Sequence, residues 1–417
     1  MAGARGSVKR WYSCALVAAG SLGAWWFAVS NETQNPNPNP KPKPQATSAT
    51  LAALHPGNRV DGPVAKPPDA LLVAAQTKLN ECGVWRSLRH WAVPVAMRQA
   101  NVQEETAESM HAALMELRAM PDERSRALSA SLGYFFDGFD QTAAKPTDEA
   151  FTPEQLAANT AIGVGNYSKR AQSLVDLAVN STDAVVYATA YLHCEKPTWL
   201  STQAKTSCAR LSAAQWARID PDNAAPWMYQ AQKAASEGDQ AAVADGFYRV
   251  SQTKRITDHQ RAAVQALMVN LPKNASEEAV VAIGDFFIGV EAATHATGYQ
   301  ALTQHCSAAK LAVPGGDANR RQICSDVADM LSQRGSSLFD LGIAIRLAKN
   351  GAWPAEKLAL AQTQLDEFMQ VVQAQVIADS SSCQGVKEAA AYRRDWIALG
   401  EVGALRQRVV TTTHVMR

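Results

Sequence analysis

The chain has 417 residues, of which 47% are hydrophobic, and its formal net charge at pH 7 is only +1. A chain of this length and composition can bury a large hydrophobic core, which excludes a wholly disordered protein. Because the charge is balanced and no basic stripe is present, the sequence gives no support for nucleic-acid binding.

The first feature along the chain is an uncharged N-terminal segment. Residues 1–10 form a basic tail that contains Arg5, Lys9 and Arg10, whereas residues 11–29 carry no charged side chain. A run of this length can cross a bilayer, and cations on its N-terminal side remain in the cytoplasm. We therefore expect a single-pass signal-anchor in the inner (cytoplasmic) membrane, with a cytoplasmic N-terminus and a periplasmic or otherwise extracytoplasmic bulk.

The alternative interpretation of this segment is a signal peptide that is removed. Ala28 and Ser30 are small residues at the two positions that export peptidases favour. Cleavage after Ser30 would produce a secreted protein without an anchor.

A proline-rich stretch follows over residues 31–68. Within it, residues 35–44 alternate proline with asparagine or lysine, which fixes φ and removes backbone hydrogen-bond donors. Such a chain is extended, at about 3.1 Å per residue. We expect a tether that holds the following domain away from the membrane.

Beyond the tether the apolar residues recur at helical spacing, and alternating strand patterns with turn dipeptides are absent. The segment 279–290 is apolar on nearly all sides but too short to cross a bilayer, which predicts a buried central helix. A clear apolar stripe comprises Leu358, Ala361, Leu365, Phe368, Met369, Val372 and Val376. The predicted fold class is all-α, with stacked helical hairpins in an irregular α-solenoid behind the N-terminal transmembrane helix.

Prolines suggest one internal boundary in the helical region. Pro146 and Pro153 have polar residues between them and mark a break in the helical pattern. We therefore divide the region into an N-terminal helical subdomain, residues 69–140, and a helical-repeat subdomain, residues 151–410.

Six of the seven cysteines lie beyond the apolar segment, an even number that favours disulfides in an oxidising compartment. Cys306 and Cys324 are equidistant from a Pro-Gly-Gly turn at residues 314–316, so an antiparallel helical hairpin would bring them together. Cys194 and Cys208 similarly flank a proline and a helix start. The spacing predicts these two local pairs.

The remaining pair, Cys82 and Cys383, would join the early and late parts of the domain, and the alternative for all six is buried free thiols. The dipeptides at His193 and His305, each followed by cysteine, suggest a metal site. However, no Cys-x-x-Cys or histidine pair at i and i+4 accompanies them, and disulfides would consume the thiolates that zinc needs. We therefore expect no metal and no cofactor.

One stretch carries a family resemblance. Residues 214–253 begin Ala-Gln-Trp-Ala-Arg-Ile-Asp-Pro and continue through Trp227, Ala231, Gly238 and Phe247. This order resembles a junction between two tetratricopeptide repeats, with a tryptophan, a small packing residue, a turn and an aromatic residue in their places. The resemblance implies a helical hairpin that is closely packed at the small residue, and a groove that binds a protein partner.

Two classes of function are compatible with these features. Gly-x-Ser-x-Gly, His-Glu-x-x-His and Walker A motifs are absent, so no catalytic residue is assigned. We expect a membrane-tethered scaffold that binds another envelope or secretory protein. The alternative is an envelope enzyme, for instance a cell-wall hydrolase, whose acid and base come from distant helices. A small pocket whose carboxylates differ in pKa would favour the enzyme, whereas a long apolar groove would favour the scaffold.

Overall fold

The computed structural model describes residues 95–141, 153–257, 259–294, 298–312, 318–377 and 383–415. Every regular element in these ranges is a helix, so the all-α prediction is confirmed for this part of the chain. The elements are α3 (Val95–Ala119), α4 (Glu123–Gln141), α5 (Pro153–Ala178), α6 (Ala184–Cys194), η3 (Pro197–Trp199), α7 (Thr202–Cys208), α8 (Ala213–Ile219), α9 (Ala225–Ser236), α10 (Gln240–Ser251), α11 (Gln260–Val269), α12 (Glu277–Thr294), α13 (Tyr299–His305), α14 (Ala308–Leu311), α15 (Ala318–Arg334), α16 (Leu338–Leu347), η4 (Ala348–Ala352), α17 (Ala355–Ile377), α18 (Cys383–Leu399) and α19 (Glu401–Val415).

The expected signal-anchor, residues 11–29, and the expected tether, residues 31–68, lie outside the described residues. Among the helices that are described, none is long and apolar enough to cross a bilayer.

Several helices begin at side chains that cap them. The side chain of Asp183 accepts hydrogen bonds from the backbone N–H groups of Val185 and Val186 at the start of α6. Ser337 and Asp340 form a reciprocal capping box at the start of α16. Such contacts satisfy backbone N–H groups that have no partner inside the helix. The starting points of these helices are therefore determined by local sequence.

The apolar segment predicted to form a central helix is α12. Its residues Ala279, Ile283 and Phe287 are buried, and the helix packs between α3 and α18. The stripe predicted for α17 is only partly correct. Its residues Ala361, Leu365 and Phe368 are buried, but Met369 is 39% exposed, because α17 packs mainly against α16 and α19.

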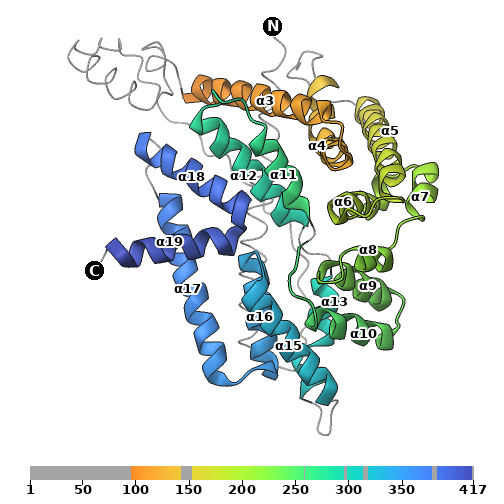
Figure 1. Ribbon diagram of the computed structural model, residues 1–417, viewed down its shortest axis with the longest axis vertical. Coiled ribbons are helices and arrows are strands. Elements are labelled where there is room, and N and C mark those ends of the chain that lie inside the picture. Colours follow the sequence, from red (N-terminus) through yellow and green to blue (C-terminus); the bar gives the residue numbers. More distant parts are fainter. Residues whose placement is uncertain are drawn as a thin grey trace, which may run out of the picture.

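The helices pack in a circuit that returns to its start. From α3 the contacts run through α4, α6, α8, α9, α10, α15, α16, α17, α19, α18 and α12, and α12 packs against α3 (Figure 1). Helix α11 contacts α3, α4, α12 and α18. Consequently, helices from the two ends of the described chain meet around α11 and α12.

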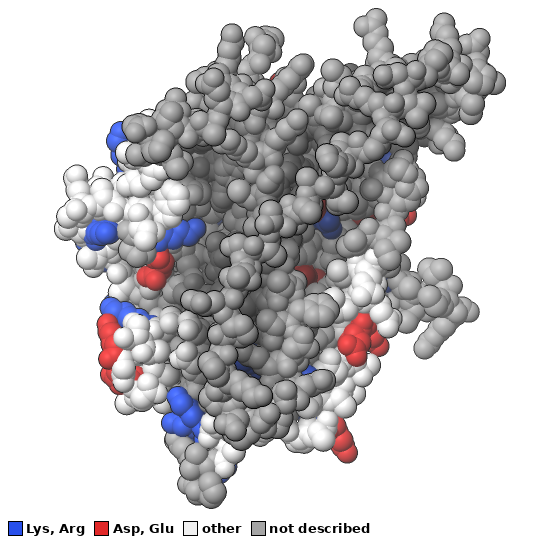
Figure 2. Space-filling view, turned by 180° about the vertical axis from the view of Figure 1, so that it is seen from behind, with Lys and Arg blue, Asp and Glu red and all other residues white. Residues whose placement is uncertain are grey.

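One large hydrophobic cluster runs through this circuit. It joins Met110 and Leu114 of α3 to Ile283 of α12 and Leu405 of α19. On the back of the molecule, basic and acidic side chains of the described part lie interspersed (Figure 2). That mixture fits the near-neutral net charge of the sequence.

Candidate functional site

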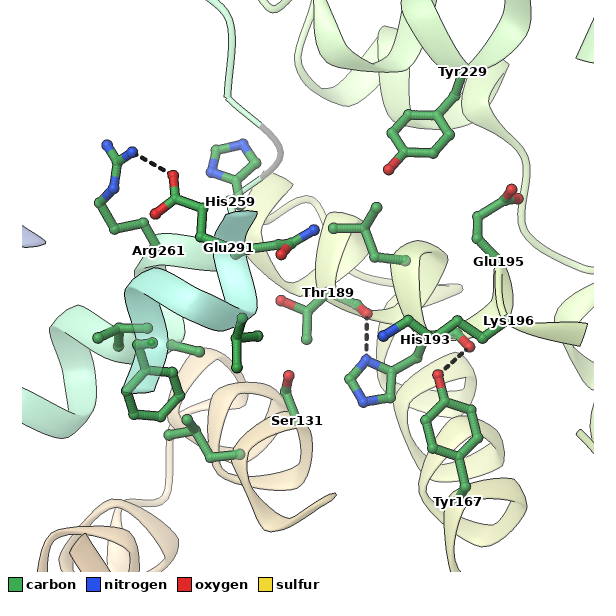
Figure 3. Close-up of a pocket in the computed structure, with 17 residues that line it drawn as sticks. Ser131, Tyr167, Thr189, His193, Glu195, Lys196, Tyr229, His259, Arg261 and Glu291 are labelled. Atoms are coloured by element: carbon green, nitrogen blue, oxygen red, sulfur yellow. Dashed lines mark hydrogen bonds and ion pairs between the residues drawn. The ribbon is translucent and has the colours of Figure 1, made fainter. Parts of the chain in front are cut away.

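A cavity of about 280 Å³ lies where the early helices meet α11 and α12. Its walls come from α4, α5, α6 with the residues that follow it, α9, α11 and α12. Figure 3 shows Arg261 and Glu291 on one side, Tyr167, His193 and Lys196 on the other. A concave site that gathers aromatic and polar groups from distant segments is the usual form of a ligand pocket.

His193 is held in one orientation at the end of α6. Its Nδ1 lies 3.2 Å from the carbonyl oxygen of Thr189, and because a carbonyl only accepts, Nδ1 must carry the hydrogen. The ring stacks on Tyr167, with centroids 5.4 Å apart and planes 13° apart. The Tyr167 hydroxyl donates to the carbonyl oxygen of His193 at 2.7 Å, so backbone and ring are both fixed.

The environment of His193 keeps its imidazole neutral. Burial, together with the positive charges of Lys196 and Arg170, lowers the pKa of His193 to about 4, although the hydrogen bond to Thr189 opposes this shift. A neutral imidazole with a proton on Nδ1 has an unprotonated Nε2 that can only accept a hydrogen bond. No described residue hydrogen-bonds this Nε2.

His259 lies on the opposite side of the cavity and is tied to Asp220. Its Nε2 is 2.9 Å from a carboxylate oxygen of Asp220, whose side chain is only 4% exposed. Burial alone would raise the pKa of Asp220. Hydrogen bonds from His259 and Asn223 and the positive charge of Arg255 have the larger, opposite effect, so the pKa of Asp220 lies below its ordinary value. Asp220 is thus an ionised acceptor, and His259 Nε2 donates to it.

His259 also has an unusual backbone. At φ 62° it lies in the left-handed region, where it is the only non-glycine among the described residues. That conformation costs roughly 1–2 kcal/mol for an L-residue, and such strain is concentrated at functional sites. The hydrogen bond to Asp220 stabilises the strained position immediately before α11.

A partly buried ion pair closes a third side of the cavity. Arg261 donates to Glu291 at 2.7 Å, and the two side chains are 17% and 13% exposed. The Arg261 guanidinium also lies 5.5 Å from the ring centroid of Trp396 in α18. The pair therefore connects α11, α12 and α18 beside the cavity.

The structure contains both local disulfides that the spacing predicts. Cys194 and Cys208 are bonded, with Cα atoms 5.5 Å apart, and join the ends of α6 and α7. Because His193, Glu195 and Lys196 line the cavity, this disulfide restrains one of its walls.

The second disulfide lies in the large hydrophobic cluster, away from the cavity. Cys306 and Cys324 are fully buried, with Cα atoms 5.7 Å apart. The third predicted pair stays a prediction, because Cys82 lies outside the described residues, as does the side chain of Cys383 at the start of α18.

The residues of the tetratricopeptide resemblance form the α9–α10 hairpin. Gly238 supplies a positive φ of 78° in the turn, Ala231 and Phe247 are fully buried, and Trp227 packs partly buried against the large cluster. A Cβ placed on Gly246 of α10 would lie 2.9 Å from the Cβ of Ala231. The two helices therefore approach closely at these small residues.

Sequence reasoning did not identify the cavity. It singled out His193 only as part of a dipeptide with cysteine, and no pattern pointed to Tyr167, His259 or Glu291. Asp220 and His259 are 39 residues apart, and Arg261 and Glu291 are 30 apart. The one local feature was Asp220, which lies between the end of α8 and Pro221 and whose role becomes clear only from its contact with His259.

The described part of the chain is an all-α protein with a largely apolar cavity, carrying a few polar groups, where α4–α6 meet α11 and α12. Comparisons with family models, curated proteins and solved structures find no match to the chain.

Proposed function

We propose that this protein is a membrane-tethered extracytoplasmic scaffold, a stack of helical hairpins that binds another envelope or secretory protein. The pair of disulfides carries the proposal, because such bonds form and persist in oxidising compartments. Residues 11–29 would supply the membrane anchor and residues 31–68 the spacer.

The α9–α10 hairpin is the candidate contact surface for the partner. Tyr248 is 53% exposed, and the guanidinium of the neighbouring Arg249 lies 4.7 Å from the ring centroid of Trp227. Arg249 is held by an ion pair of 2.9 Å with Asp245. Tryptophan, tyrosine and arginine are the residues most enriched at the energetic centres of protein interfaces.

The test is site-specific crosslinking in the native membrane. A photoreactive phenylalanine analogue at position 248 should form one discrete protein adduct, and Arg249→Ala should abolish it. The same analogue at position 199, where Trp199 is 39% exposed, is the matched control and should not form that adduct. The same adducts from both positions, or an adduct unaffected by Arg249→Ala, would contradict the assigned surface.

The anchor is tested separately by the intact mass of the membrane-extracted protein. We expect residues 1–30 to be present. A mature N-terminus at Asn31 would instead indicate a cleaved signal peptide and a secreted product.

An envelope enzyme, for instance a cell-wall hydrolase, is the second candidate, and the cavity is the observation that favours it. The cavity brings together two carboxyl groups, Glu195 directly after α6 and Glu291 of α12, which lie far apart in the sequence. Release of soluble fragments from cell-wall polymer by the purified chain, lost in Glu291→Gln, would support this candidate. Absence of product from the folded wild type would contradict it.

A further inference from the structure

The formal charges of the cavity lining cancel. Two basic residues, Lys196 and Arg261, and two acidic residues, Glu195 and Glu291, line the cavity, and Arg261 is already bound to Glu291. A ligand with a large net charge would therefore find no matching excess of opposite charge.

The environment of His193 restricts the ligand further. The positive charges of Lys196 and Arg170 that disfavour protonation of this ring also disfavour an ammonium group beside it. The unprotonated Nε2 presents a lone pair, which repels an anion and can pair only with a hydrogen-bond donor on the ligand. The group that suits this position is a neutral hydroxyl or N–H.

The rest of the lining combines apolar surface with a few hydroxyl groups. Tyr167, Tyr229 and Phe287 offer aromatic surface for packing against C–H groups, and Ser131 and Thr189 supply hydroxyls beside it. A hydroxyl can donate to one such group and accept from another. The volume of about 280 Å³ is close to the lower limit for pockets of small organic ligands.

From these contacts we infer that the cavity between α4–α6 and α11–α12 binds a neutral, hydroxyl-rich ligand of the sugar class, with one ligand hydroxyl donating to His193 Nε2. The site is separate from the protein-binding surface proposed on α9–α10, so each can fail without the other. It also differs from the enzyme proposal, since binding requires no turnover.

The binding experiment uses the full chain and compares three sugars that have the same pyranose ring but differ in charge. Glucose is neutral, glucosamine carries an ammonium group, and glucuronate carries a carboxylate. Saturation-transfer NMR and calorimetry at pH 6.5 should show saturable binding of glucose, or of the neutral probes galactose or N-acetylglucosamine. Glucosamine and glucuronate should bind at least about ten-fold more weakly than the neutral sugar. Equal or tighter binding of either charged sugar, or no saturable binding of any neutral probe, would overturn the inference.

The role of Nε2 is tested with His193→Asn. The asparagine amide can still donate to the Thr189 carbonyl but removes the acceptor at Nε2, so affinity for the neutral sugar should fall about ten-fold. His305→Asn is the matched control, because His305 also ends a helix, precedes a disulfide cysteine and lies against an aromatic ring, yet does not line the cavity. Its sugar affinity should equal that of the wild type.

A second variant guards against poor folding of His193→Asn. Ser131→Leu on the α4 wall fills cavity space and leaves the residue at position 193 unchanged, and it should also abolish sugar binding. Retained wild-type affinity in both cavity variants, each with its normal helical content, would show that the sugar binds elsewhere and would refute the site.

Discussion

The low pKa of His193 makes the stability of the fold depend on pH. Its pKa of about 4 in the folded protein compares with 6.5 for an unperturbed histidine, so the unfolded chain binds the proton more readily. The free energy of unfolding therefore has its full value, as far as His193 is concerned, above the pKa of the unfolded chain. It decreases as the pH falls from 6.5 toward 4, because protonation then favours the unfolded chain. These two values imply a loss of about 2 kcal/mol between pH 7 and pH 5, and about 3 kcal/mol over the whole range.

Urea denaturation of the wild type and of His193→Asn at both pH values measures this contribution. Other titrating groups affect both proteins alike, so the wild type should lose about 2 kcal/mol more than the variant between pH 7 and pH 5. NMR of ring-labelled histidine should give a midpoint near pH 4 for His193. Equal losses in the two proteins, or a midpoint near 6.5, would refute the reasoning that burial and the two neighbouring cations keep this ring neutral.

The packing of α9 against α10 predicts opposite effects for two glycines. Gly246→Ala should destabilise the protein by about 1 kcal/mol in thermal denaturation, because the cost of packing the new methyl group against Ala231 exceeds the gain in helix propensity. In Gly163→Ala nothing lies within 4 Å of the new methyl group, so the same gain in propensity should stabilise the protein by about 1 kcal/mol. Stabilisation by both would contradict the close approach. Replacing both Cys306 and Cys324 with alanine should lower the free energy of unfolding by about 3 kcal/mol without abolishing the helical circular dichroism signal, and non-reducing peptide mapping of the wild type should recover these two cysteines in one linked peptide.

Local features of this protein could be predicted from the sequence because their causes lie within a few residues. The apolar positions of α17 recur every three to four residues, as helix geometry requires, and the α12 segment is apolar on nearly all sides. Gly238 and Asp239 mark the turn and cap between α9 and α10. The two local disulfides span 14 and 18 residues, close enough that a proline or a Pro-Gly-Gly turn could indicate the pairing.

The cavity forms only through tertiary packing and could not be predicted from the sequence. The ring of His193 is neutral because burial beside α5, Lys196 and Arg170 disfavours its protonation. His259 holds a left-handed conformation beside an ionised Asp220. These contacts depend on how the helices return to pack around α11 and α12. Helix periodicity specifies which face of each helix is buried but not which distant helix covers it, so a site made from several helices leaves no pattern along the chain.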